Sequence, residues 1–555
     1  MKPPAAGGIA MALAAALALL TFFQFPGHTW LQQDTQIYTA ILEHLRDPSV
    51  LANDILAEKP HVAFTLYDEA ARLARAATGL SFRVVLEAAQ IGARALGIWG
   101  LYLIALALGL TTSEAWLVAA IVSLGATIAG PEVLTLEYEP SPRALALPLV
   151  ICAIGLAGHR RFVAASLAGA AAFLLHPPTA LAFWLVFLTL AAWPHLRRVA
   201  ATDPRPEPFI TAARLAPPAA WPAGIFLASV AVLLLAARAQ AGPGESQALF
   251  ARLTPGQVQL QHLRTAYTWI STWPPRLIAL WLAVFALAMA AYARIRQNVP
   301  PELRAFLVGL PVLGVLSMPA SWLLLERAGW SLVPQIQPLR LLLFVALSMQ
   351  ILAAAAGLDA LRRRSHFEAG FWFVLAYLLP LEPVVTGPRE WARLGLLLAL
   401  AAGTVVARRY APAVTLAAFF AIPGVGGVVN YPHLHTPELA QLSAWARTAT
   451  GRDAVFVFPD AGHAVDPGIF RCEALRAVYV DWKGGGQVNF FREFGEQWWY
   501  RWQQTVARGF QPSDLPRYRG LGISYAVLNA ADRLPQPPVF QNARYAVYAT
   551  PAASP

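Results

Sequence analysis

The first long apolar segment of the chain is followed directly by residues 28–69, HTWLQQDTQIYTAILEHLRDPSVLANDILAEKPHVAFTLYDE. This stretch is acidic, although the sequence on either side of it is largely apolar. We expect a carboxylate-rich loop at the mouth of a membrane protein to hold the chemistry. The other apolar segments and the C-terminal region would then be arranged around it. Its acidic residues are Asp34, Glu43, Asp47, Asp54, Glu58, Asp68 and Glu69.

The composition of the 555-residue chain indicates a membrane protein. It is 57% hydrophobic and only 13% charged, with a mean hydropathy of +0.50, whereas soluble domains are about 25% charged. Apolar runs of about 20 residues recur, and that length spans a bilayer as a helix. The sequence therefore predicts an α-helical polytopic membrane protein. The net charge of +11 does not indicate a nucleic-acid partner, because Lys and Arg cluster in short loops between the apolar runs.

Thirteen apolar segments are predicted to cross the membrane as helices. The first of them resembles a signal peptide in composition, but it ends FFQFPGH without a small-x-small cleavage site. We therefore interpret it as a retained helix. The predicted spans are at about 7–26, 85–110, 115–130, 143–158, 162–176, 179–194, 217–237, 276–293, 305–323, 340–358, 370–386, 391–407 and 411–429.

The distribution of positive charge predicts the orientation of these spans. Short loops rich in Lys and Arg face the cytoplasm, and with thirteen alternating spans all such loops fall on one side. The N-terminus is then cytoplasmic in a bacterial inner membrane. The first loop, 28–84, and the region after 429 are predicted to be periplasmic. The basic loops are at 160–161, 197–198, 294–296, 362–364 and 408–409.

Polar residues within the apolar segments are few. Glu87, Gln90 and Arg94 form a stripe on one face of the second predicted span, which fits either a wet cavity or a structural ion pair near a helix end. The two cysteines, Cys152 and Cys472, lie in an apolar segment and in the C-terminal region. Neither a disulfide between them nor a cysteine metal site is expected.

The composition changes after Asn430, and residues 430–555 are predicted to form a soluble α/β domain next to a transmembrane domain, 1–429. A helix is expected at 436–449, where Thr436 suits the N-cap, and another at about 490–508. About 125 residues are enough for a core of the domain's own. Runs rich in Val, Tyr and Phe predict strands at 454–459, 476–482, 524–530 and 545–550.

Asp34 is the sharpest candidate for a catalytic residue. It lies shortly beyond the first predicted span and is flanked by Gln33 and Gln36. A carboxylate held beside a membrane helix can accept a proton from an acceptor hydroxyl. The residues that follow, QIYTAILEHL, suit a helix, so Asp34 also suits an N-cap. The two roles are compatible, because a carboxylate has more than one lone pair.

Other candidates for substrate binding lie in later outer loops. Glu137 and Glu139 point the same way if LEYEPSPR is extended, and form a solvated turn otherwise. Arg143 and Arg340 suit a phosphate, because a guanidinium offers a forked set of donors. Snorkelling toward lipid headgroups is the alternative for both arginines. His176, at a helix–turn boundary, is a weaker candidate, since a histidine there is more often structural.

The C-terminal domain contributes the segment FRCEALRAVYVDWKGGG. It places Arg471 and Lys483 near a strand end and a Gly-rich turn, where exposed amides and an ammonium can meet an anion. A solvated strand end is the alternative. The sequence has no P-loop, Gly-x-Ser-x-Gly, His-Glu-x-x-His or Cys-x-x-Cys motif, which gives no support to an ATP-driven pump or a zinc protease.

This layout resembles the GT-C superfamily of integral-membrane glycosyltransferases. The resemblance rests on the first helix, the large first outer loop with an acid just past the membrane (QQDTQIY, Asp34), the many further spans and the outer C-terminal domain. FRCEALRAVYVDWK also resembles uncharacterised bacterial multi-span proteins near this superfamily. The sequence departs from the pattern at Thr35, where many members have a second acid. It also lacks a WWD signature, since Trp498-Trp499 is followed by Tyr500.

The resemblance implies that a sugar is moved from a polyprenyl-phosphate donor to an acceptor hydroxyl at the outer face, with inversion and with Asp34 as general base. The donor phosphate is expected to meet Arg340, with Arg143 or Lys483. No cofactor is required, a divalent metal remains open, and the acceptor is a glycan, lipid or protein.

Two alternatives to an enzyme remain. One is a transporter or flippase of a lipid-linked sugar, and the other is a non-catalytic partner in cell-envelope assembly. Internal repeats and ionisable groups near the midplane would favour a transporter. The sequence shows no repeat, and its polar residues gather at the outer rim.

Overall fold

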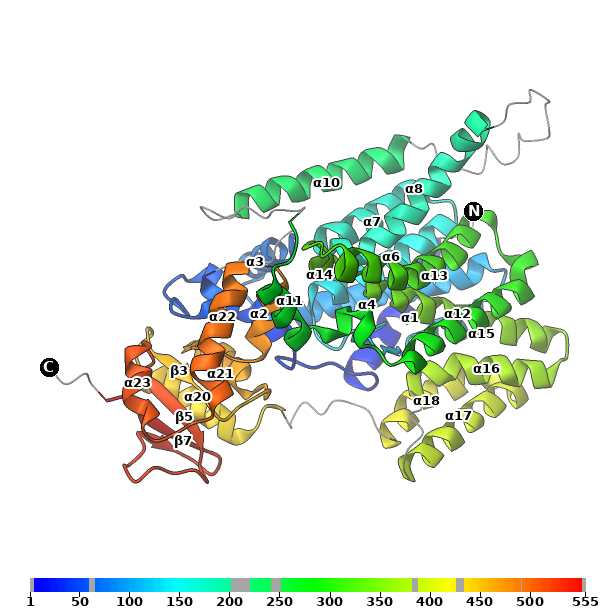
Figure 1. The fold of residues 1–555 in the computed structure, drawn as a ribbon. Coiled ribbons are helices and arrows are strands. Elements are labelled where there is room, and N and C mark those ends of the chain that lie inside the picture. The colour runs from blue at the N-terminus through cyan, green and yellow to red at the C-terminus, as the bar shows by residue number, and fades with distance from the viewer. Residues whose placement is uncertain are drawn as a thin grey trace.

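The computed structural model describes residues 4–58, 65–200, 220–240, 251–381, 388–425, 434–490 and 492–551. A body of packed helices forms most of the molecule, and a smaller domain with a β-sheet lies at one end of it (Figure 1). The predicted domain boundary near residue 430 lies outside the described residues.

Apolar helices occur at all thirteen predicted segments, because long runs of Ala, Leu, Val and Phe can satisfy their backbone within a bilayer only as helices. The central helix is α15, whose side chains are almost all buried. The thirteen helices are α1 (Pro4–Phe23), α4 (Phe82–Ala107), α5 (Thr112–Val122), α6 (Pro142–Gly158), α7 (Phe162–Leu175), α8 (Pro177–Ala200), α10 (Ala220–Gln240), α12 (Pro275–Ile295), α13 (Pro301–Ser321), α15 (Leu343–Arg362), α16 (His366–Leu381), α17 (Pro388–Val406) and α18 (Ala411–Gly424).

The chain is a membrane protein by the length and composition of these helices. Among the described residues, five helices are long and apolar enough to cross a membrane, or six if the bent pair α17 and α18 is one span. The axes of these two helices differ by 108°, where the sequence predicts two separate crossings. The predicted span at 115–130 is also shorter than expected, because α5 ends at Val122. The chain then forms a hairpin of β1 (Thr127–Ile128) and β2 (Val133–Leu134).

Close backbone approach holds α4 and α6 together. A Cβ atom on Gly100 would lie 2.5 Å from the Cα of Cys152, and one on Gly155 would lie 2.6 Å from the carbonyl oxygen of Gly100. Small residues allow such contacts between membrane helices, where packing replaces the hydrophobic effect as the driving force. This tight pair matters because α4 and α6 both carry residues that shape the candidate site.

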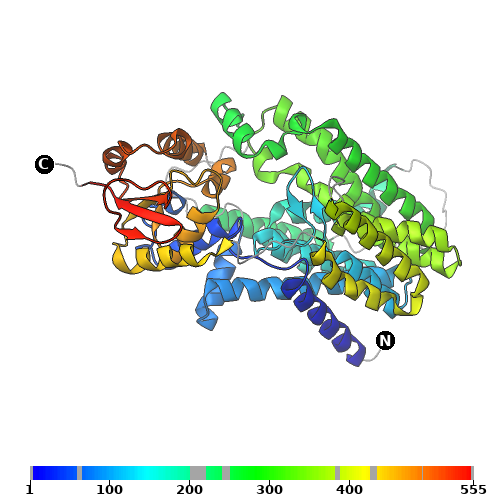
Figure 2. The same cartoon turned by 90° about the horizontal axis from the view of Figure 1, so that it is seen from below.

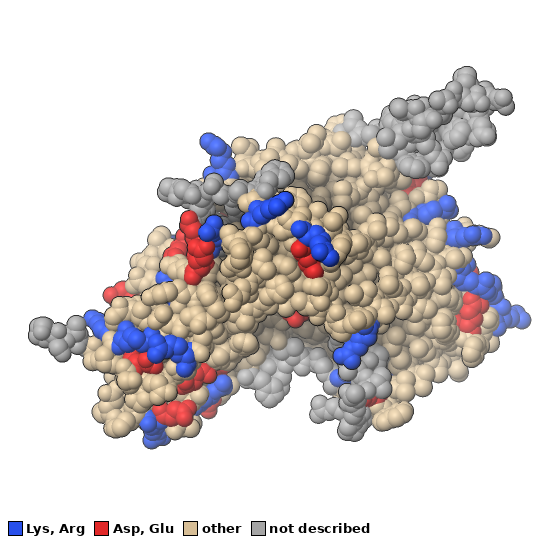
Figure 3. Space-filling view, in the orientation of Figure 1, with Lys and Arg blue, Asp and Glu red and all other residues tan. Residues whose placement is uncertain are grey.

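The predicted basic loops converge on shared carboxylates at the end of the helix body away from the β-sheet domain (Figure 3). The side chains of the loop at 197–198 lie outside the described part of the chain. Arginines of the other four loops form ion pairs that connect different helices, which is consistent with one common face. These pairs are Arg160–Glu302, Arg294–Glu368, Arg363–Glu368, Arg362–Glu114 and Arg408–Glu114.

The C-terminal domain contains a five-stranded sheet in the order β4-β3-β5-β7-β6. β3 pairs in parallel with β4 and β5, while β7 is antiparallel to β5 and β6. The four predicted strands and both predicted helices are present, whereas α21, α23 and β6 were not expected. The elements are α20 (Pro437–Ala449), β3 (Val455–Val457), α21 (Asp466–Ala474), β4 (Ala477–Val478), η8 (Lys483–Asn489), α22 (Arg492–Gln504), η9 (Val506–Arg508), α23 (Asp514–Gly520), β5 (Tyr525–Asn529), β6 (Phe540–Gln541) and β7 (Tyr545–Ala549).

The sequence predicts that this domain has a hydrophobic core of its own. The structure instead shows a core that the domain shares with the first loop. The loop forms α2 (Thr35–Arg46), η1 (Ile55–Ala57) and α3 (Tyr67–Thr78). Ile41 of α2 and Ile55 of η1 are fully buried in one cluster with β3, β5 and α22, and Figure 2 shows the loop against the domain. Because one core cannot extend through a bilayer, the loop and the domain lie on the same side of the membrane.

A buried ion-pair network joins the loop to the domain. The Arg471 side chain is completely buried, and its Nε lies 2.7 Å from Asp54 Oδ2 while its second terminal nitrogen lies 2.5 Å from Asp481 Oδ1. Asp54 also accepts hydrogen bonds from the amides of Leu56 and Val478. The guanidinium therefore fixes α21, β4 and η1 to one another.

We predict that Arg471→Met weakens the attachment of the loop to the domain, because it leaves Asp54 and Asp481 buried without a cation. Removing one partner of a buried ion pair costs about 3–5 kcal/mol. Thermal unfolding of the detergent-solubilised protein, followed by tryptophan fluorescence, should show a clearly lower midpoint. The matched control is Arg492→Met, since Arg492 forms an exposed i,i+4 pair with Glu496 that adds little stability. Equal midpoints for the two variants would contradict the assignment.

Candidate active site

Asp34 lies at the start of α2 but does not use its carboxylate to cap that helix. Its side chain accepts no hydrogen bond from the first helical amides. Instead, Asp34 Oδ1 lies 2.9 Å from the Nζ of Lys483, and the side chain remains 35% exposed at the wall of a cavity. The N-cap interpretation therefore holds for the position of Asp34 and not for its side chain.

Lys483 is presented to Asp34 by the Gly-rich segment η8. The Asp481 carboxylate that pairs with Arg471 also accepts a hydrogen bond of 2.9 Å from the amide of Gly484, which fixes the start of this segment. A Cβ on Gly485 would lie 2.5 Å from the Trp498 ring, so the turn packs too closely for a larger residue. The network at Arg471 thus determines where Lys483 lies. The chain contains three lysines, Lys2, Lys59 and Lys483.

The electrostatic environment keeps both partners of this ion pair charged. Burial alone would raise the pKa of Asp34, but the positive charges of Lys483, Arg143 and Arg340 outweigh it and lower the pKa to about 2. Burial alone would lower the pKa of Lys483, but the Asp34 charge outweighs it and raises the pKa. At neutral pH the site therefore holds a carboxylate and an ammonium.

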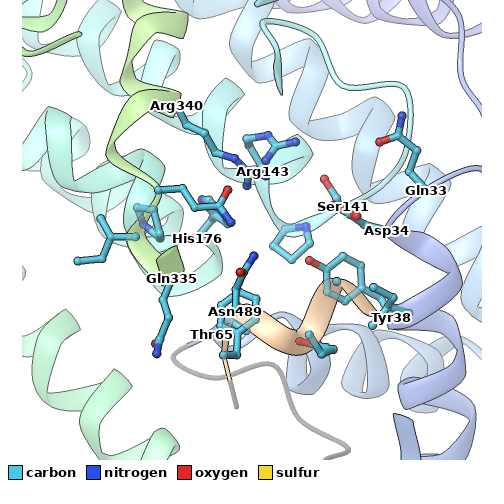
Figure 4. Close-up of a pocket in the computed structure, with 18 of the residues that line it drawn as sticks. Gln33, Asp34, Tyr38, Thr65, Ser141, Arg143, His176, Gln335, Arg340 and Asn489 are labelled. Atoms are coloured by element: carbon cyan, nitrogen blue, oxygen red, sulfur yellow. The ribbon is translucent and has the colours of Figure 1, made fainter. Parts of the chain in front are cut away.

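Two arginines face Asp34 across the cavity. Arg143, in the first turn of α6, is buried and pairs through its Nε with Glu137 Oε1 at 2.7 Å. Arg340 comes from η6 (Pro338–Leu342) and lies beside Arg143 (Figure 4). Its buried Nε has no hydrogen-bond partner among the described residues. Arg143 is enclosed by protein, so it does not snorkel toward headgroups, and Arg340 offers an unoccupied donor.

The cavity has a volume of about 720 Å³ and two different walls. Polar side chains of the first loop, α6, α11 (Pro255–Arg264), η6 and η8 form one wall. The apolar part of the lining, called the apolar wall, belongs to α7, α10 and the segment before η6, which also contributes Gln335 and Gln337. Its residues are Phe173, Leu175, Val230, Leu233, Leu234, Leu332 and Ile336.

Five of the eight predicted site residues line this one cavity, although they come from five separate segments of the chain. His176 already has a partner within the chain, because its Nδ1 lies 2.9 Å from Thr179 Oγ1. Its structural interpretation therefore stands beside the functional one. The five residues are Asp34, Arg143, His176, Arg340 and Lys483.

The other three predicted site residues do not line this cavity. Arg471 is enclosed by its two aspartates, so the expectation that it contacts substrate is wrong. Glu137 pairs with Arg143, and Glu139 accepts hydrogen bonds from the backbone of residues 32–35. The two glutamates border only a small adjoining hollow and do not act together as expected. They have different partners because Tyr138 separates them on a bent, hydrogen-bonded loop.

Gln90 and Arg94 of the polar stripe on α4 donate hydrogen bonds to the backbone of the loop that carries Glu137. Arg94 is 1% exposed and donates hydrogen bonds to the carbonyls of Thr21, Gly27 and Glu137 at 3.0, 3.0 and 2.6 Å. Gln90 donates to the carbonyl of Glu137 at 2.9 Å. The stripe is therefore structural, and it ties the end of α1 to both outer loops.

Several cavity residues were not anticipated from the sequence. Arg264, at the end of α11, stacks on Trp482 with its guanidinium carbon 3.8 Å from the ring centre. Gln335 and Gln337 precede Arg340, and the buried Gln337 Oε1 has no partner in the described structure. The amide-rich PQIQP before Arg340 was a usable signal, whereas nothing local distinguishes Arg264. Across the described ranges, no group of three His, Cys, Asp or Glu side chains is placed to hold a metal ion.

Comparisons with known proteins give weak similarities over long ranges. Neither the known protein-family models nor the curated proteins include a match. Among solved structures, ArnT from Cupriavidus metallidurans in the apo state is 13% identical, with 99% of both chains covered and a TM-score of 0.42. The same protein bound to undecaprenyl phosphate is 12% identical, with 98% of both chains covered and a TM-score of 0.43. The arabinofuranosyltransferase AftD from Mycobacteria is 17% identical over 96% of this chain and 36% of its own, with a TM-score of 0.42.

We predict that Asp34→Asn increases the rate at which an amine-reactive reagent modifies Lys483. Without the carboxylate, burial dominates and the pKa of Lys483 falls, so more of the amine is unprotonated at pH 8. Mass spectrometry of the Lys483 peptide should show modification several-fold faster than in the wild type, with the Lys2 and Lys59 peptides as internal references. Asp47→Asn, just past the far end of the same helix and paired with Arg452, is the control and should leave the rate unchanged. An unchanged rate in Asp34→Asn would mean that the ion pair does not form.

Proposed function

We propose that this protein is a GT-C-type glycosyltransferase. It moves a sugar from a polyprenyl-phosphate donor to an acceptor hydroxyl on the periplasmic face of a bacterial inner membrane, with inversion. The observation that carries this proposal is the Arg340 guanidinium, whose Nε has no hydrogen-bond partner among the described residues. It lies beside Arg143 and faces the Asp34 carboxylate across a cavity with one apolar wall. Such a site matches a ligand with a phosphate head, a long hydrocarbon tail and a polar group to be transferred.

The phosphate and the hydrocarbon chain of the donor bind to different parts of the cavity. Its phosphate receives hydrogen bonds from Arg340 and Arg143, because guanidinium groups present forked donors to phosphate oxygens. Its hydrocarbon lies along the apolar wall, where Leu234 of α10 lines the cavity and is 56% exposed. The tail therefore passes α10 into the bilayer, and the sugar points toward Asp34 and the amide side chains.

Asp34 acts as the general base. As the acceptor oxygen attacks the anomeric carbon, Asp34 takes the hydroxyl proton. The bond from that carbon to the phosphate oxygen breaks, and its electron pair leaves with the polyprenyl phosphate. A carboxylate with a pKa of about 2 is a weak base at neutral pH, because general bases work best with a pKa near the working pH. Binding of the anionic phosphate attracts Lys483 away from Asp34, which raises the pKa of Asp34 when the donor is in place.

We predict that Asp34→Asn loses about 10²- to 10⁴-fold in kcat, the usual contribution of a general base. Its thermal midpoint should remain near that of the wild type, because Asp34 caps no helix. The assay supplies a panel of prenyl-phosphate sugars to protein in nanodiscs and follows conversion of phosphodiester to prenyl phosphate by ³¹P NMR. Asp47→Asn is the control. Near-normal release by Asp34→Asn would remove it from the mechanism. Movement of intact donor across vesicles without release, by the wild type, would indicate a flippase.

We predict that Arg340→Met weakens binding of undecaprenyl phosphate to the purified protein. A hydrogen bond to a charged group contributes about 1.5–3 kcal/mol, which corresponds to a loss of about 10- to 150-fold in affinity. Titration in nanodiscs with detection by tryptophan fluorescence measures this. Arg304→Met is the matched control, since Arg304 is exposed at the start of α13 and away from the cavity. Equal affinity of Arg340→Met and the wild type would exclude Arg340 as a phosphate ligand.

A further inference from the structure

The start of α2 does not use the Asp34 side chain as its cap. The first amides of a helix need acceptors, and an aspartate at the N-cap normally supplies one from an extended backbone conformation. Asp34 has φ −69° and ψ −24°, which is helical, and its side chain accepts no cap bond. The amides of Gln36 and Ile37 donate instead to the carbonyls of Gln33 and Asp34, at 3.2 and 2.9 Å, while the amide of Thr35 donates to a side-chain group elsewhere in the chain.

That group is the carboxylate of Glu139, more than 100 residues away in the sequence. Its Oε1 accepts hydrogen bonds from the amides of Gln32 and Gln33, the latter at 2.8 Å, and its Oε2 accepts one of 3.1 Å from the amide of Thr35. The hydroxyl of Thr35 in turn accepts from the amide of Leu31 at 2.9 Å. The backbone on both sides of Asp34 is thus attached to a single side chain.

Glu139 is itself held rigidly. The amide of Ser141 donates to its carbonyl at 2.8 Å, and the carbonyl of Tyr138 accepts from the amide of Thr29 at 3.1 Å. Glu139 is 6% exposed, and Arg94 of α4 donates to the neighbouring carbonyl of Glu137. A carboxylate so enclosed, with both oxygens engaged by amides, is held in one position.

We propose that Glu139 is the positioning residue of the site: by holding the backbone amides on both sides of Asp34, it fixes the start of α2 so that the Asp34 carboxylate faces the cavity. The proposal rests on the proposed function, in which Asp34 is the base. This role explains why the buried Glu139 carboxylate lies close to that of Asp34. Burial of the Glu139 charge is unfavourable, and it raises the pKa of Glu139. The three amides offset that cost, since charge-assisted hydrogen bonds are among the strongest in proteins.

The test is a double-mutant cycle in the prenyl-phosphate release assay. Glu139→Gln keeps the shape but replaces one acceptor oxygen with a donor, so that one amide loses its partner and Asp34 shifts. Displacement of a catalytic group by about 1 Å costs about 10²-fold in rate. We expect a loss of that order in kcat with the KM for the donor within twofold, because Arg340 and Arg143 are untouched. In an Asp34→Asn background, Glu139→Gln should cause no further loss.

Several results would overturn the proposal. They are an unchanged kcat in Glu139→Gln, a raised donor KM at normal kcat, or a loss that multiplies with that of Asp34→Asn. Glu43→Gln, on the same helix and ion-paired with Arg46, is the matched control. Glu139→Asp provides a second variant with the charge retained and the reach shortened. If it folds where Glu139→Gln does not, the same cycle is measured with it.

A second readout does not depend on turnover. Because Glu139 holds Asp34 against Lys483, Glu139→Gln should increase the rate of amine modification of Lys483 toward the value in Asp34→Asn, while Glu43→Gln should not. A failure of the glycosyltransferase proposal would leave this result intact. An unchanged modification rate in Glu139→Gln would refute the positioning role, whatever the enzyme does.

Discussion

The contact on which the rest of the structure depends is the enclosure of Arg471 between Asp54 and Asp481. The network buries two carboxylates with one guanidinium. Replacing a buried ion-pair network with apolar side chains of the same volume often leaves a protein as stable or makes it more stable. The effect of this network is geometric. Asp54 belongs to the first loop, and Asp481 fixes the amide of Gly484 and hence the segment that carries Lys483. One guanidinium thereby brings together the two halves of the site.

The cavity follows from this attachment. Asp34 enters it from the first loop, Lys483 from the C-terminal domain, and Arg143 and Arg340 from the helix body. None of these segments encloses a cavity by itself. Among the residues that line it, positive charges exceed negative ones at the polar wall, while the apolar wall has none. This asymmetry suits an amphipathic anion better than a free soluble one. A phosphate bound there would neutralise the positive charge of Arg340.

The sequence predicts the elements of this fold more fully than their partners. Apolar helices and four strands occur where local patterns predict them, although the helix predicted at 115–130 ends at Val122 and α17 and α18 form a bent pair. α21, which begins Asp-Pro-Gly, was too short for such a pattern. Partner choice is a long-range property. Glu139 appeared to be a ligand because it is acidic and near the membrane, yet it serves amides on another loop. Arg471 similarly appeared to be an anion site, since nothing nearby shows that Asp54 neutralises it.

The shared core also sets an order on biosynthesis. Ile37, Ile41 and Ile55 of the first loop are covered by strands and helices between residues 455 and 548, which are made after every membrane helix. At about 5–20 residues per second, the loop waits on the order of tens of seconds outside the membrane with its apolar face bare. During that interval it is open to proteases and to wrong partners. A cell that makes this protein must therefore protect the loop until the chain is complete. Only then can Arg471 join the loop to the C-terminal domain.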